Sequence, residues 1–148
     1  MTISSNGLCA LVSALLMAAP GLAHGAEPDE VGIIAVVMRS DGAVRKLVRE
    51  EVYAIFVLDK RGNLQPLDLP ETDPVRAAFY MRLAGKSLGM MRALRSTLVF
   101  TGAGRPPKQL ELAAVHERLA NDPTAIAYLP MPDLPLGVRV VATLAPAP

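Results

Sequence analysis

Residues 31–38 limit the folds open to this chain more than any other segment, because they are eight nearly continuous apolar positions rich in valine and isoleucine. A strand with one face in water alternates apolar and polar side chains, and this run does not. It therefore predicts a strand that is buried on both faces. Such a strand needs elements packed on both sides of its sheet, and the rest of the chain has to supply them.

The remaining segments carry the periodicities of further helices and strands. Apolar residues at helical spacing predict helices over residues 47–58, 74–84, 88–100 and 109–121. Short apolar runs predict strands over residues 64–69, 125–129 and 138–144. Pro66 favours a short or edge position for the first of these strands. This order is typical of an α/β domain, a mixed sheet of about four strands with packed helices.

Capping residues mark where two of the helices begin and end. Thr72 or Asp73 can cap the helix that starts with Pro74, and Gly85 ends it. Ser87 can cap the next helix. A helix boundary is therefore predicted between residues 84 and 88.

Spacing also predicts which side chains are buried. Val48 shares a helix face with Val52, so both are expected in the core. Arg92 and Arg95 fall outside the apolar face of their helix, and Phe100 is expected inside.

The first 26 residues read as a secretory signal peptide, since they hold none of the chain's charged residues and contain an apolar run over residues 8–19. The run is too short to span a bilayer. Small residues allow cleavage after Ala23, Gly25 or Ala26. The segment before the run has no Lys or Arg, so an uncleaved anchor and a misassigned start codon are alternatives. The only cysteine, Cys9, lies at the start of the run and inside the signal segment, so residues 27–148 fold as one domain without a disulfide.

Catalytic and metal-ligating residue sets are scarce in the chain. His116-Glu117 begins like a zinc-protease signature, but Ala120 stands where a second histidine would be needed. No nucleophile can be paired with a histidine and an acid at any specific spacing. We therefore predict that the protein is not an enzyme and binds no metal or cofactor.

A positive stretch interrupts the near-neutral charge of the chain between residues 74 and 110. It holds seven basic residues and no acidic one: Arg76, Arg82, Lys86, Arg92, Arg95, Arg105 and Lys108. An anionic ligand or an acidic protein surface would fit such a stretch, and so would the bland alternative, the solvated outer faces of two helices. No stacking platform of aromatic residues accompanies it, so no nucleic acid is expected.

Several motifs resemble a known family when they are taken in order. They are Ala54-Ile55-Phe56, the segment 66–70 with Arg76 and Phe79 after it, a Phe-Thr-Gly-x-Gly-x-Pro-Pro loop over residues 100–107, and Ala-Ile-x-Tyr within residues 123–129. The series resembles the small exported proteins that look like one lobe of phosphate ABC transporter substrate-binding proteins. The resemblance covers residues 31–141 and implies a single lobe of a type 2 periplasmic-binding fold, here residues 27–148.

The family also implies where a ligand would bind, at a helix N-terminus that offers amides to an oxyanion. The matching ligand-binding residues would be Thr72, Asp73, Arg76, Thr101, Gly102, Gly104 and Arg105. Full-length phosphate binders carry an Arg followed by Ser-Gly-Thr at this helix start, whereas this chain has Asp73 and Pro74. Spacing alone favours a simple turn for the Gly102 to Arg105 loop.

Two functions follow as predictions. The first is a periplasmic binding component that captures phosphate or another small anion for an ABC transporter or sensor. The second is an interaction module that has lost its ligand and docks on an envelope transporter, porin or sensor through a basic patch of Arg82, Lys86, Arg92 and Arg95. Neither requires a membrane span once the signal is removed.

Overall fold

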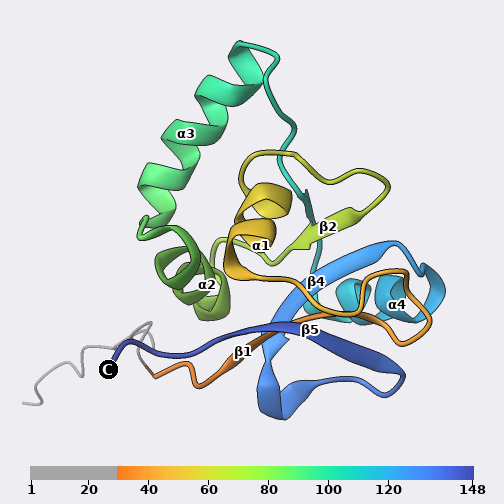
Figure 1. Cartoon of the computed structure of the whole chain (residues 1–148). Coiled ribbons are helices and arrows are strands. Elements are labelled where there is room, and N and C mark those ends of the chain that lie inside the picture. The colour runs from red at the N-terminus through yellow and green to blue at the C-terminus, as the bar shows by residue number, and fades with distance from the viewer. Residues whose placement is uncertain (1–29) are drawn as a thin grey trace, which may run out of the picture.

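A computed structural model describes residues 30–148, and the predicted signal segment lies outside them. The sheet has five strands in the order β3-β2-β4-β1-β5 (Figure 1). The strands are β1 Ile34–Arg39, β2 Gln65–Asp68, β3 Lys108–Gln109, β4 Ala125–Pro130 and β5 Val138–Leu144. The helices are α1 Arg49–Phe56, α2 Pro74–Ala84, α3 Leu88–Phe100 and α4 Leu112–Asn121, and a 3-10 turn covers Met131–Asp133. None of the helices in the described part is long and apolar enough to cross a membrane.

The sheet is mixed, as the sequence predicts. Strand β1 pairs antiparallel with both β4 and β5, whereas β2 runs parallel to β3 and β4. A bulge between Val36 and Val37 shifts the β1–β5 register, and the carbonyl of Val141 accepts the backbone N–H of Leu47 at 2.8 Å. The segment before α1 is thereby held against β5.

Strands β1 and β4 form the centre of the core. Every residue from Ile34 to Met38 is fully buried, and so is every residue from Ala125 to Leu129, so both faces of these strands are covered. This confirms the prediction from the apolar run. Helix α4 packs against β1 and β4, while α2 contacts β4 and β5.

Four aromatic rings join α1, α2 and β4. Phe79 stacks on Tyr128 with centroids 3.8 Å apart, and Phe56 meets Phe79 edge to face at 5.1 Å. Tyr80 also contacts Phe79, at 5.0 Å. Aromatic pairs of this kind add about 0.5–1.5 kcal/mol each beyond the area that they bury. The cluster holds the middle of α2 against α1 and β4.

The predicted caps of α2 and α3 are confirmed. The Asp73 carboxylate accepts the N–H of Val75 at 2.9 Å, and Gly85 ends α2 in the left-handed conformation with φ 63°. The Ser87 hydroxyl accepts the N–H of Met90 at 3.3 Å. Gly85 and Ser87 together set the sharp turn between α2 and α3.

Four details of the prediction are wrong. Val48 is the N-cap of α1 and is exposed, because the chain leaves the helix there toward β5. Gln109, expected in the first turn of a helix, forms with Lys108 a strand beside β2, so the sheet has five strands. Of the two alternatives for β2, the short strand is confirmed, since it has four residues and lies between β3 and β4. Phe100 is 93% exposed because α3 leaves the sheet toward its C-terminal end. Arg95 points inward, as the next section describes.

Candidate functional site

A buried carboxylate lies at the carboxyl end of β2. Asp68 is only 1% exposed, and its backbone carbonyl accepts the N–H of Leu110 at 2.9 Å, which ties the strand to the segment after β3. A buried charge is costly unless it is paired and hydrogen-bonded. The residues around Asp68 meet this requirement in full.

Two tyrosines donate to the Asp68 carboxylate. The hydroxyl of Tyr80 on α2 donates to Oδ2 at 3.1 Å, and the hydroxyl of Tyr128 on β4 donates to Oδ1. The Tyr128 oxygen in turn accepts the backbone N–H of Leu69 at 3.2 Å. Burial, followed by the charge of Asp68, raises the pKa of both tyrosines far above the ordinary value, so both stay protonated as donors.

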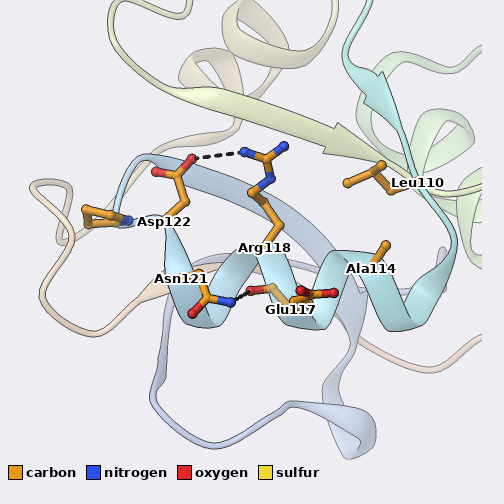
Figure 2. Close-up of a pocket in the computed structure, with 7 residues that line it drawn as sticks. Leu110, Ala114, Glu117, Arg118, Asn121 and Asp122 are labelled. Atoms are coloured by element: carbon orange, nitrogen blue, oxygen red, sulfur yellow. Dashed lines mark hydrogen bonds and ion pairs between the residues drawn. The ribbon is translucent and has the colours of Figure 1, made fainter.

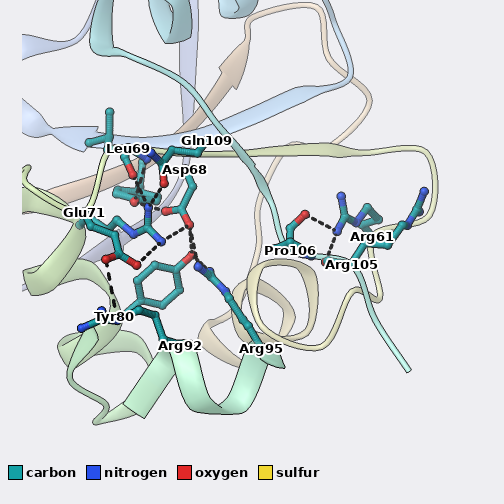
Figure 3. A network of polar contacts seen from close by, with 12 residues as sticks. Arg61, Asp68, Leu69, Glu71, Tyr80, Arg92, Arg95, Arg105, Pro106 and Gln109 are labelled. Atoms are coloured by element: carbon teal, nitrogen blue, oxygen red, sulfur yellow. Dashed lines mark hydrogen bonds and ion pairs between the residues drawn. The ribbon is translucent and has the colours of Figure 1, made fainter. Parts of the chain in front are cut away.

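Two arginines complete the network, which we call the Asp68 cluster: Asp68, Arg76, Tyr80, Arg95 and Tyr128 (Figure 3). Arg95 Nη1 lies 3.0 Å from Asp68 Oδ2, and its Nη2 donates to the Tyr80 hydroxyl. Arg76 Nη2 lies 3.5 Å from the same carboxylate oxygen. The Arg95 guanidinium also lies over the Tyr80 ring, 4.7 Å from its centroid.

Arg76 has further partners that anchor it from both sides. Its Nη1 donates to the Leu69 carbonyl and to Gln109 Oε1, both at 2.7 Å. Glu71 lies 3.6 Å from Arg76 and 3.8 Å from Arg92, a long contact in both cases. The Nε atoms of Arg76 and Arg95 are buried without a hydrogen-bond acceptor among the described residues.

A groove of about 680 Å³ opens over this cluster, between α3 and the segment that returns to β3. We call it the basic groove. Its polar lining is Asp68, Glu71, Arg76, Arg92, Arg95, Ser96 and Gln109, and its apolar lining is Val99, Phe100, Pro106 and Pro107. Three cations against two carboxylates leave the lining with an excess positive charge.

The predicted anion-binding residues are divided between two places. Arg76 lines the basic groove, whereas Thr101 and Gly102 lie at the far end of α3. The Asp73 carboxylate already occupies the α2 N-terminus, and Thr72 is exposed in the turn before it. The helix start and the loop therefore do not form one shared site.

The glycine loop is held by its own contacts. The backbone N–H of Arg105 donates to Asp59 Oδ2 at 2.8 Å, and the N–H of Gly102 donates to the Val99 carbonyl at 3.1 Å. A Cβ on Gly104 would come within 3.3 Å of the Asp59 Cβ, so glycine permits this close approach. The Thr101 hydroxyl donates to the Thr97 carbonyl at 2.9 Å. Asp59 thus takes the place that an anion would have in this loop.

The predicted basic patch is also divided. Arg82 donates to the carbonyls of Gly32 and Val31 and so fastens the start of the described chain to α2. Arg95 belongs to the Asp68 cluster, Lys86 is half-buried, and Arg92 has a 67% exposed side chain. Of these four residues, Arg92 offers the most accessible charge.

A second hollow, of about 530 Å³, lies along α4 (Figure 2). Its charges are paired along the helix, with Arg118 3.7 Å from Asp122, and Asn121 donates to the Glu117 carbonyl at 3.0 Å. Two carboxylates against one guanidinium make it unsuitable for an anion. No three metal-ligating side chains gather anywhere in residues 30–148.

Sequence reasoning missed Asp68, Tyr80, Tyr128 and Gln109 as site residues. Asp68 stands between Leu67 and Leu69, and strand alternation would place it on the opposite face from them. An acidic residue inside an apolar strand that ends at a helix start is the one signal that could have indicated it.

Comparisons with known proteins give a likeness of fold only. No family model matches the chain. No curated protein matches its sequence. Solved structures do match, among them an ABC-type phosphate transport receptor from Vibrio cholerae, with a TM-score of 0.54 and 10% identity over 75% of this chain. Another is a putative phosphate ABC transporter substrate-binding protein with bound phosphate from Clostridium perfringens, with a TM-score of 0.55 and 12% identity over 75% of this chain.

The chain spans less than half of both proteins, 47% of the first and 45% of the second. Its described part is therefore similar in fold to one lobe-sized portion of a phosphate transport receptor.

Proposed function

We propose that this protein is an exported, non-catalytic binding domain that captures a small anion in the basic groove, for delivery to a transporter or sensor in the cell envelope. The observation that carries the proposal is the excess positive charge of the groove lining. The likeness in fold to phosphate transport receptors supports the class of function, and phosphate is the first ligand to test.

The chemistry of the groove suits an anion that binds without reaction. Asp68 neutralises only part of the charge of Arg76 and Arg95, and within residues 30–148 the Nε atoms of both arginines have no hydrogen-bond acceptor. Arg92 is exposed and has only a 3.8 Å contact with Glu71. An anion between Arg92 and Arg76 would gain charge-assisted hydrogen bonds while the Asp68 cluster holds one side rigid.

Ligand-dependent stabilisation tests the proposal. A ligand at a hundredfold excess over its Kd stabilises the folded state by about 2.7 kcal/mol. Thermal unfolding with phosphate, sulfate, nucleotides and organic acids should reveal at least one anion that raises Tm. No shift with any of them at millimolar concentration would overturn the proposal.

Two substitutions that change the charge of the groove in opposite directions test whether the anion binds there. Glu71→Gln removes a competing carboxylate, so it should tighten anion binding, whereas Arg92→Gln should weaken it. Both residues are at the rim, where a charge change costs little stability. Arg45→Gln, an exposed arginine at the β5 end of the sheet, is the matched control and should leave affinity unchanged. Equal effects of Arg92→Gln and Arg45→Gln would mean that only net charge matters.

Export is the second part of the proposal. The mature protein should begin after Ala23, Gly25 or Ala26 and be recovered from the periplasm. N-terminal sequencing of the fractionated protein measures both. An intact N-terminus in the membrane fraction would instead favour an uncleaved anchor.

Docking on an envelope protein is the alternative, and exposed apolar side chains on α3 favour it. Met90 is 53% exposed, Val99 55% and Phe100 93%, along one projecting helix. Exposed apolar surface of this kind often marks a contact with another protein. Met90→Ser with Val99→Ser should then abolish co-purification of a partner from envelope extracts, and Leu136→Ser, an equally exposed loop change, should not.

A further inference from the structure

The basic groove has two walls of different chemistry. We call Arg76, Arg92 and Arg95 the cationic wall and Val99, Phe100 and Pro106 the apolar wall, and α3 contributes residues to both. A volume of about 680 Å³ lies within the roughly 300–1,000 Å³ that is usual for small organic ligands. Such a space is much larger than a bare inorganic oxyanion needs.

The cationic wall is rigid where it is buried. Asp68 accepts both tyrosine hydroxyls and pairs with both arginines, so these four partners hold its buried carboxylate and the two guanidinium groups in place. Arg95 has a 13% exposed side chain and Arg76 a 6% exposed one, so neither can turn far. A negative headgroup is the complement of this wall.

The apolar wall has unused surface. Phe100 is 93% exposed although it lies at the rim of the groove, and Val99 beside it is 55% exposed. A ring left in water gains free energy from any apolar group that covers it. An inorganic anion cannot provide that cover, whereas an organic anion with a hydrocarbon part can.

We infer that the basic groove selects an organic anion that carries an apolar tail or ring, with its negative headgroup at Arg76 and Arg92 and its apolar part against Val99, Phe100 and Pro106. This inference rests on the proposed function, because it uses the same groove, and it adds the class of ligand.

Four probes separate the contributions of charge and tail. Octanoate has both, acetate has only the carboxylate, octanol has only the tail, and inorganic phosphate is the reference anion. Isothermal titration of the purified protein should give a Kd for octanoate at least tenfold below that for acetate or phosphate, and no binding of octanol. A tenfold ratio corresponds to about 1.4 kcal/mol.

Variants test whether the cationic wall binds the headgroup and the apolar wall binds the tail. Phe100→Ser should weaken octanoate about tenfold and leave acetate unchanged, since about half of the ring would be covered by the tail. Arg92→Gln should weaken octanoate and acetate by the same factor. Leu136→Ser and Arg45→Gln are the matched controls, both exposed and away from the groove lining. The exposure of Phe100 and Arg92 keeps the variants folded, and circular dichroism verifies this.

The outcomes distinguish this inference from the function on which it rests. If octanoate binds no more tightly than acetate, or if phosphate binds more tightly than octanoate, the inference is overturned and anion capture still stands. Octanol as tight as octanoate would overturn the inference and count against anion capture as well. Absence of binding by all four probes would overturn the inference, and absence of any thermal shift with sulfate and nucleotides as well would overturn anion capture.

Discussion

Asp68→Asn is the sharpest test of the Asp68 cluster. The substitution keeps the size of the side chain and removes its charge, so Arg76 and Arg95 lose their buried counter-ion at 3.5 and 3.0 Å. Removing one partner of a buried ion pair costs about 3–5 kcal/mol, because the remaining charge stays buried. The total stability of a domain is only about 5–15 kcal/mol, so we expect a large but measurable loss.

Urea unfolding measures the loss. With a slope of about 2 kcal/mol/M, a loss of about 4 kcal/mol lowers the midpoint by about 2 M. The chain has no tryptophan, so far-ultraviolet circular dichroism is the suitable probe. Asp133→Asn, an exposed carboxylate in the 3-10 turn, is the control and should change stability by less than about 0.5 kcal/mol.

A double mutant identifies the cause of the loss. If the uncompensated Arg95 charge is responsible, the double mutant Asp68→Asn with Arg95→Gln should be no less stable than Asp68→Asn alone. The two substitutions would then have a coupling energy of about 2 kcal/mol or more. Additive losses would refute the reasoning. So would an Asp68→Asn protein whose midpoint equals that of the control.

Three further changes test the caps and the loop. Gly85→Ala should lose about 1–2 kcal/mol because the residue has φ 63°. Gly89→Ala lies in α3, where an added Cβ would meet only Ser87 Oγ at 3.9 Å, so it should gain up to about 1 kcal/mol. Thermal denaturation of both variants gives the two signs. Asp73→Ala should lose about 1 kcal/mol with the α2 cap, and Asp73→Ser should restore most of it; equal stability of the two would contradict the capping role. Burial raises the pKa of Asp59, but the Arg105 N–H and the charges of Arg61 and Arg105 outweigh it, so the folded pKa lies below the ordinary value. Ionised Asp59 therefore stabilises the fold fully above about pH 4, and this stabilisation is lost as the pH falls through the lowered pKa. The Tm difference between the protein and Asp59→Asn should be present at about pH 7 and shrink progressively as the pH falls below about 4.

Local features of the fold could be predicted from the sequence because their causes are local. The apolar run before residue 39, the caps at Asp73 and Ser87 and the stop at Gly85 depend on side chains within a few residues of the element that they define. Burial on both faces of β1 followed from its unbroken apolar run alone. The α/β class and the mixed sheet follow from the order of such elements.

The site could not be predicted in this way, because long-range contacts form it. Asp68, Arg76, Arg95 and Tyr128 come from β2, α2, α3 and β4, and no spacing in the chain indicates that they meet. The two residues of β3 become a strand because they pair with Leu67 and Asp68 of β2, which are far from them in the sequence. The sequence by itself determined the four helices, four of the five strands and the helix ends at Asp73, Gly85 and Ser87. Only the tertiary structure decided how the basic residues between 74 and 110 are used. Arg76 and Arg95 are buried beside Asp68, Arg82 donates to backbone carbonyls, and Arg92 is exposed at the basic groove. The reason is that burial and pairing depend on which elements pack together.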